Sequence, residues 1–146
     1  MGSDICGLIV AKKFGIPTGG TMPFGFKTQD GPKPEYKELY GMVAHSSSSY
    51  VPRTRVNVKN SDGTLRLAFD FNSPGEKCTK KAIISYKKPF FDVDLNNPCD
   101  VALVCEWLKV NNIKILNVAG NTERTATGIT KKAIEYLTKL FESLDD

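Results

Sequence analysis

The C-terminal part of the chain holds the feature that most restricts the fold: an apolar run, a polar segment and a helical pattern in direct succession. The apolar run over 113–118 predicts a β-strand, and Gly120 marks its end. Residues 121–129 predict a loop, and apolar residues at helical spacing over 130–144 predict a helix. This order is typical of α/β domains, which bind ligands beyond the carboxyl ends of parallel strands and beside helix N-termini. The same spacing also fits a βα turn that requires glycine only for its backbone angles.

The rest of the chain shows the same alternation of helix and strand patterns. Helices are predicted over 5–14, 50–59, 75–86 and 100–110. Strands are predicted over 16–20, 64–71 and 89–93. Alternating strands and helices imply parallel βαβ units. We therefore predict an α/β fold, a three-layer Rossmann-like sandwich with a mainly parallel sheet, formed by residues 1–146 as one domain.

Local signals predict how several of these elements begin and end. The first helix is expected to have one apolar face, formed by Ile5, Leu8, Ile9 and Phe14, and to be capped by Ser3 or Asp4. The strand over 16–20 is expected to end in Gly19-Gly20. Ser48 or Ser49 is expected to cap the helix over 50–59, and one residue of Asn111-Asn112 to be left-handed.

Composition restricts the kinds of partner. The chain has 146 residues and a net charge of +4, which is compatible with an anionic small molecule and does not indicate a nucleic-acid partner. Its four cysteines lie far apart and, with one histidine, offer no metal-ligand spacing. No signal peptide and no apolar run of membrane-spanning length is visible. We therefore predict reduced cysteines, no membrane association and a cytoplasmic location.

Four segments together resemble one known family. The first contains Gly2 and Asp4, and the second contains Gly19-Gly20, Pro23, Gly25, Asp30-Gly31-Pro32 and Tyr36. The third contains Tyr50, Arg53-Thr54, Asn57-Val58 and residues 61–64, and the fourth contains residues 117–121, Glu123 and Gly128-Ile129. In this order, and over nearly the whole chain, they are similar to the putative molybdenum carrier family. That family is a circularly permuted SLOG group related to lysine-decarboxylase-like Rossmann proteins.

The resemblance also implies a difference at the start of the sheet. The family normally begins with a strand and two glycines before the position of Gly2, whereas Met1 stands here in place of the threonine of that motif. Either this sequence is a truncated form of a longer chain, or this member of the family has lost its first strand. A missing central strand leaves the backbone groups of its neighbours unpaired unless another element or subunit fills the gap.

The resemblance implies a binding or carrier protein for a phosphorylated small molecule. The expected ligand is molybdenum cofactor, which is a pterin phosphate, or a nucleotide, and neither a protein-bound metal nor a catalytic residue is expected. A homo-oligomer is expected because related proteins with this sandwich fold commonly assemble. The residues expected to contact the ligand are Gly2, Ser3, Gly19, Gly20, Gly25, Arg53, Ser73, Gly75, Thr79, Gly120, Asn121 and Glu123.

An alternative is a nucleotide-processing hydrolase similar to the phosphoribohydrolase relatives. In those relatives a glutamate follows the glycine-rich loop that corresponds to residues 72–79. Lys80 and Lys81 stand at that position in this chain, so the obvious carboxylate for hydrolysis is absent. The sequence shows no nucleophile and base at recognisable spacing.

Overall fold

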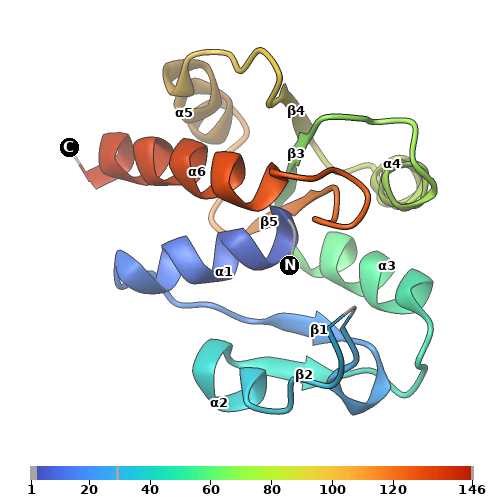
Figure 1. Cartoon of the computed structure of the whole chain (residues 1–146). Coiled ribbons are helices and arrows are strands. Elements are labelled where there is room, and N and C mark those ends of the chain that lie inside the picture. Colours follow the sequence, from blue (N-terminus) through green and yellow to red (C-terminus); the bar gives the residue numbers. More distant parts are fainter. Residues whose placement is uncertain (1–2, 29, 146) are drawn as a thin grey trace.

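A computed structural model describes residues 3–28 and 30–145. Its helices are α1 (Ser3–Lys13), α2 (Tyr36–Tyr40), α3 (Tyr50–Asn60), α4 (Pro74–Tyr86), α5 (Val101–Val110) and α6 (Ile129–Asp145), with a 3-10 turn, η1 (Phe24–Phe26). Its strands are β1 (Gly20–Met22), β2 (Met42–Ala44), β3 (Gly63–Ala68), β4 (Phe90–Asp94) and β5 (Leu116–Gly120). Strands and helices alternate along the chain (Figure 1), which confirms the predicted α/β fold.

The strand pairs are parallel, as predicted, but in the described residues they form two sheets and not one. Strand β3 lies between β4 and β5 in a three-stranded sheet, whereas β1 pairs only with β2. Over 3–28 and 30–145, no strand connects β5 to β1. The two sheets are therefore separate in the part of the chain that the structure describes.

Helix α1 packs against both sheets. One side of it joins the main core through Cys6, Val10 and Ala11. The other side contacts the core of the smaller sheet through Ile5, Leu8 and Ile9. The expectation of a single apolar face is therefore wrong, because α1 lies between the two sheets (Figure 1) and has to present apolar side chains to each of them.

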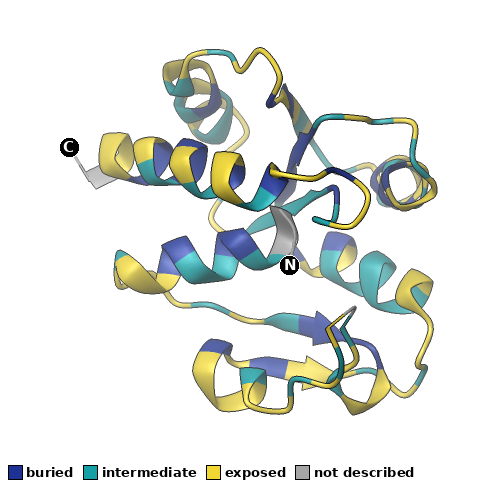
Figure 2. Cartoon of the chain, viewed as in Figure 1, coloured by how far each residue is buried: buried dark blue, intermediate teal, exposed yellow. Residues whose placement is uncertain are grey.

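The main core lies between the three-stranded sheet and the layer formed by α1, α5 and α6 (Figure 2). Leu65 and Leu67 of β3 are fully buried there, together with Ile129, Leu137 and Leu140 of α6. Arg66, between these two leucines, points to the opposite face and donates a hydrogen bond to the carbonyl of Glu76 in α4. Helices α3 and α4 share a small apolar cluster on that face. The fold is thus the predicted three-layer sandwich.

Two of the predicted helix signals are confirmed. The hydroxyl of Ser49 accepts a hydrogen bond from the N–H of Val51 (3.4 Å), so Ser49 caps α3. Asn112 is left-handed, with φ of 51°, after the end of α5. The predicted cap of α1 falls on the side chains of Ser3 and Asp4, which lie outside the described part of the structure.

Two predicted strands are displaced along the chain. The strand predicted over 16–20 begins only at Gly20, because Thr21 and Met22 are buried and pair with β2, whereas Ile16 is 41% exposed. The glycine pair Gly19-Gly20 therefore lies at the amino end of β1 and not at its carboxyl end. The apolar run over 113–118 likewise forms β5 only from Leu116, because the Asp62 carboxylate accepts the N–H groups of residues 114 and 115.

Gly7 lies at a close contact between α1 and β5. A Cβ atom at this position would be 2.8 Å from the Cβ of Val118 and 3.0 and 3.2 Å from its two γ carbons. We expect Gly7→Ala to lower the free energy of unfolding by about 1–3 kcal/mol, because the overlap pushes α1 away from the sheet despite the better helix propensity of alanine. Urea unfolding followed by circular dichroism measures this change.

The matched control for this substitution is Gly75→Ala in the first turn of α4. A Cβ at Gly75 meets no atom within 4 Å, so we expect a change of no more than about 0.5 kcal/mol. If Gly7→Ala were as stable as Gly75→Ala, the close packing of α1 on β5 would be contradicted.

Candidate functional site

The carboxyl ends of the parallel strands define one edge of each sheet, and five connections begin there. They are η1 after β1, residues 45–49 between β2 and α3, residues 69–73 between β3 and α4, residues 95–100 between β4 and α5, and residues 121–128 between β5 and α6. Helix α1 begins at the same edge, since the chain turns back after α1 and enters β1 in the opposite direction (Figure 1). We call this region the carboxyl edge.

Asn121 ties two of these connections together. Its side chain is buried, and its Oδ1 accepts the N–H groups of Phe69 (2.8 Å) and Asp70 (3.0 Å). Its Nδ2 donates to the carbonyl of Asp70 (2.9 Å). Gly120, directly before it, has φ of 152°, which suits glycine. The side-chain amide of Asn121 therefore holds the loop after β3 against the loop after β5.

Asn57 has a comparable function in the smaller sheet. Its Oδ1 accepts the N–H of Thr21 (2.8 Å), and its Nδ2 donates to the carbonyl of Thr21 (3.0 Å). These backbone groups belong to the edge of β1 that does not face β2, because Met22, next along the strand, directs its carbonyl to His45 beyond β2. The amide of Asn57 thus takes the place of a neighbouring strand and fixes α3 to β1.

Glu123 caps α6 with its carboxylate. One oxygen accepts the N–H of Gly128, and the other accepts the N–H of Thr130 (3.1 Å). The N–H groups of Gly128 and Thr130 hold the pKa of Glu123 below its usual value of 4.5, because they stabilise the charged form. A protein carboxylate therefore already occupies the N-terminus of α6, where an anionic ligand would otherwise fit.

This capping makes the stability of the fold depend on pH. A lowered pKa in the folded state stabilises the protein above the unfolded pKa, and the effect is lost as the pH falls through the folded pKa. We therefore expect Glu123→Gln to lower the melting temperature at pH 7, and we expect the difference from the wild type to shrink below about pH 4.5. Thermal unfolding between about pH 3 and pH 7 measures this difference. The exposed residue Glu135 on the same helix provides the control Glu135→Gln, and an equal pH profile for both variants would contradict the capping role.

The N-terminus of α4 lies after β3 at the same edge. Ser73 is its N-cap and accepts the N–H of Glu76 (3.4 Å). Gly75 is exposed, and the space beside it is open. The hydroxyl of Thr79 donates to the carbonyl of Gly75 (3.1 Å) and is buried one turn further along the helix. Of these three predicted contacts, Ser73 and Gly75 lie at the carboxyl edge, whereas Thr79 is bonded within its own helix.

The remaining predicted contacts are divided between the edge and other places. Arg53 lies in the first turn of α3, and Gly25 lies in η1, so both are at the carboxyl edge of the smaller sheet. Gly19 and Gly20 are at the opposite end of β1. Gly2 lies outside the described residues, and Ser3 begins α1 with a side chain that is not described.

Cations that the sequence did not single out also lie at this edge. The Nζ of Lys132, in the first turn of α6, is 5.5 Å from the centre of the Phe69 ring. The Nζ of Lys27 is 5.3 Å from the centre of the Tyr50 ring. Both lysines occur in polar segments of the kind that usually face solvent. Only the folded arrangement brings them to the carboxyl edge, so no sequence signal could have identified them. The nearby acid Asp70 accepts the N–H of Asn72 (2.8 Å).

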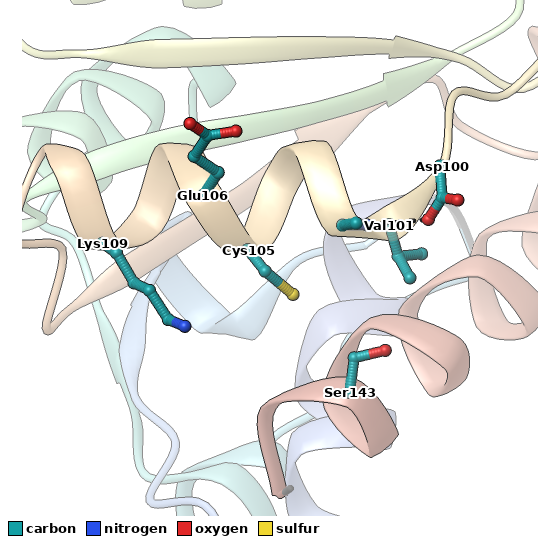
Figure 3. A pocket seen from close by; sticks show the side chains of 7 residues that line it. Asp100, Val101, Cys105, Glu106, Lys109 and Ser143 are labelled. Carbon is teal, nitrogen blue, oxygen red and sulfur yellow. Dashed lines mark hydrogen bonds between the residues drawn. The ribbon is translucent and has the colours of Figure 1, made fainter.

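Two shallow hollows on the surface contain none of the predicted contacts. One, of about 410 Å³, lies between α5 and the end of α6, where Cys105, Lys109 and Ser143 face it (Figure 3). The other, of about 390 Å³, lies between α4 and the loop after β3, where Phe71 and Asn72 line it. Across residues 3–28 and 30–145, no three His, Cys, Asp or Glu side chains come together in a way that could hold a metal ion. Nor does any described helix have the length and apolar character needed to cross a membrane.

Parallel strands between two helical layers, with fixed loops at their carboxyl ends, define the protein as a Rossmann-like α/β domain. A model of the circularly permutated YpsA SLOG family matches residues 1–141. The chain therefore belongs to this family, which confirms the relationship expected from its sequence segments.

A solved structure agrees with this assignment. The chain is similar to the crystal structure of a "putative molybdenum carrier protein" from Syntrophus aciditrophicus, with a TM-score of 0.86 and 30% sequence identity. The match covers 94% of this chain and 87% of the other. None of the curated proteins matches the sequence.

Proposed function

We propose that the protein binds and carries a phosphorylated small molecule at the carboxyl edge. The observation that carries this proposal is the charge at that edge, where Lys132, Lys27 and Arg53 lie against aromatic rings. The acids Asp70 and Glu123 at the same edge accept backbone N–H groups. Positive charge beside loops that the amides of Asn57 and Asn121 hold in place suits a phosphate.

Within this class, the ligand we propose is molybdenum cofactor or a nucleotide. The name of the similar protein from Syntrophus aciditrophicus supports the first, and the Rossmann-like fold supports both. The donors at the carboxyl edge are backbone N–H groups, lysines and an arginine, which fit the phosphate of either ligand. They are not metal ligands, so any molybdenum would arrive as part of the bound molecule.

Calorimetric titration of the purified protein tests this function. We expect saturable binding of molybdopterin or of guanosine monophosphate, and weaker binding of guanosine, which has no phosphate. The absence of saturable binding for both phosphorylated probes would contradict the proposal.

A further inference from the structure

Two cations from separate segments lie against one aromatic ring beside β1. Lys27 follows η1, and its Nζ is 5.3 Å from the centre of the Tyr50 ring. Arg53 belongs to α3, and its Cζ is 5.5 Å from the same centre. Tyr50 itself is the first residue of α3, directly after the cap Ser49. The ring therefore gathers two positive charges at the start of a helix.

The backbone that carries Lys27 is constrained. Gly25 and Phe26 both have positive φ, at 74° and 56°, and this conformation is uncommon for phenylalanine. The turn is also tied to its surroundings, because the N–H of Phe24 donates to the carbonyl of Ser47 (2.7 Å) and the N–H of Lys33 donates to the carbonyl of Phe26 (2.8 Å). Ser47 lies shortly before Tyr50, so the turn is held against the segment that leads into α3.

The charge at the start of α3 is unusual for a helix of 11 residues. Its first turn contains Arg53 and no acid, although the N-terminus of a helix carries partial positive charge and favours acids. Lys27 adds a second cation at the same place. The two side chains and the helix N-terminus therefore each add positive potential beside the Tyr50 ring, and positive potential favours an anion.

We propose that Lys27, Tyr50 and Arg53 bind the phosphate group of the ligand. The lysine and the arginine contact the phosphate oxygens, and the Tyr50 ring positions both cations. The proposal rests on the proposed function, since it assigns the phosphate end of the same ligand to the side of the carboxyl edge formed by η1 and α3. The N-terminus of α6, at the same edge, is a less suitable place for the phosphate, because the Glu123 carboxylate already accepts its N–H groups.

The experiment compares Lys27→Met with Lys59→Met by calorimetry, using molybdopterin and guanosine monophosphate as probes. Both substitutions remove one exposed positive charge, and Lys59 lies in the last turn of α3, far from Tyr50 along the helix. We expect Lys27→Met to weaken binding about fivefold or more, and Lys59→Met to leave it unchanged. We also expect binding to Lys27→Met to be less sensitive to added salt than binding to the wild type.

A second pair of variants tests the ring. Tyr50→Phe keeps the aromatic face and is expected to bind as the wild type does, whereas Tyr50→Leu is expected to bind about as weakly as Lys27→Met. If the wild type binds a probe and Lys27→Met binds it as tightly as Lys59→Met, this inference is overturned and the proposed function stands. If the wild type binds neither probe, the proposed function fails, and this inference fails with it.

Discussion

Replacing Asn121 with alanine is expected to lower the free energy of unfolding by about 2–4 kcal/mol. The substitution removes three hydrogen bonds from a side chain that is 1% exposed. The N–H groups of Phe69 and Asp70 lose their acceptor, and alanine supplies no other. Because Asn121 connects the loops after β3 and β5, we also expect ligand binding to weaken sharply. Urea unfolding followed by circular dichroism measures the loss of stability.

Hydrogen exchange adds a local measurement to this prediction. The amides of Phe69 and Asp70 are expected to exchange faster in Asn121→Ala, because their hydrogen bonds are the ones removed. The matched control is Asn97→Ala, at an exposed position, with an expected change of no more than about 0.5 kcal/mol. Equal stability of the two variants, or unchanged exchange at Phe69 and Asp70, would contradict the proposal that Asn121 holds the loops after β3 and β5 together.

The elements of the fold could be predicted wherever a local signal determines them. Serine before Tyr50 and the asparagines after α5 indicate a helix start and a helix end through bonds to nearby residues, and both predictions are confirmed. The start of β5 could not be predicted in this way. It depends on the Asp62 carboxylate, which is 53 residues from Ile115 in sequence and accepts its N–H. An apolar run shows that a strand is near but not where pairing begins.

The same distinction explains what the sequence revealed about the site. Sequence segments indicated Arg53, Asn121 and Glu123, and the structure places all three at the carboxyl edge. Their contacts could not be predicted, because the partners of Asn121 lie 51 and 52 residues away. Lys27 was overlooked for a related reason. Its approach to Tyr50 depends on the positive φ of Phe26, which the sequence does not indicate.

The ion pair between Arg66 and Asp92 is expected to give the second large effect on stability. The Arg66 side chain is 4% exposed, and its Nε and one terminal nitrogen donate to the two Asp92 oxygens at 2.7 and 2.6 Å. Asp92→Ala leaves this guanidinium without its carboxylate. We expect a loss of about 2–4 kcal/mol in the free energy of unfolding, below the upper range for fully buried pairs because Asp92 is 30% exposed. Urea unfolding measures it, with Glu106→Ala as an exposed control of equal charge change.

The double variant Arg66→Met/Asp92→Ala shows where this cost arises. The penalty of the single variant comes from a buried charge without a partner, so removing the arginine charge as well should recover part of the lost stability. We expect the double variant to be more stable than Asp92→Ala, although it lacks one further hydrogen bond, from Arg66 to the carbonyl of Glu76 (3.0 Å). A double variant less stable than Asp92→Ala would mean that Arg66 stabilises the fold mainly through packing and its bond to α4. The comparison therefore separates the contribution of the Arg66 charge to the free energy of unfolding from the contribution of its packing and its bond to α4.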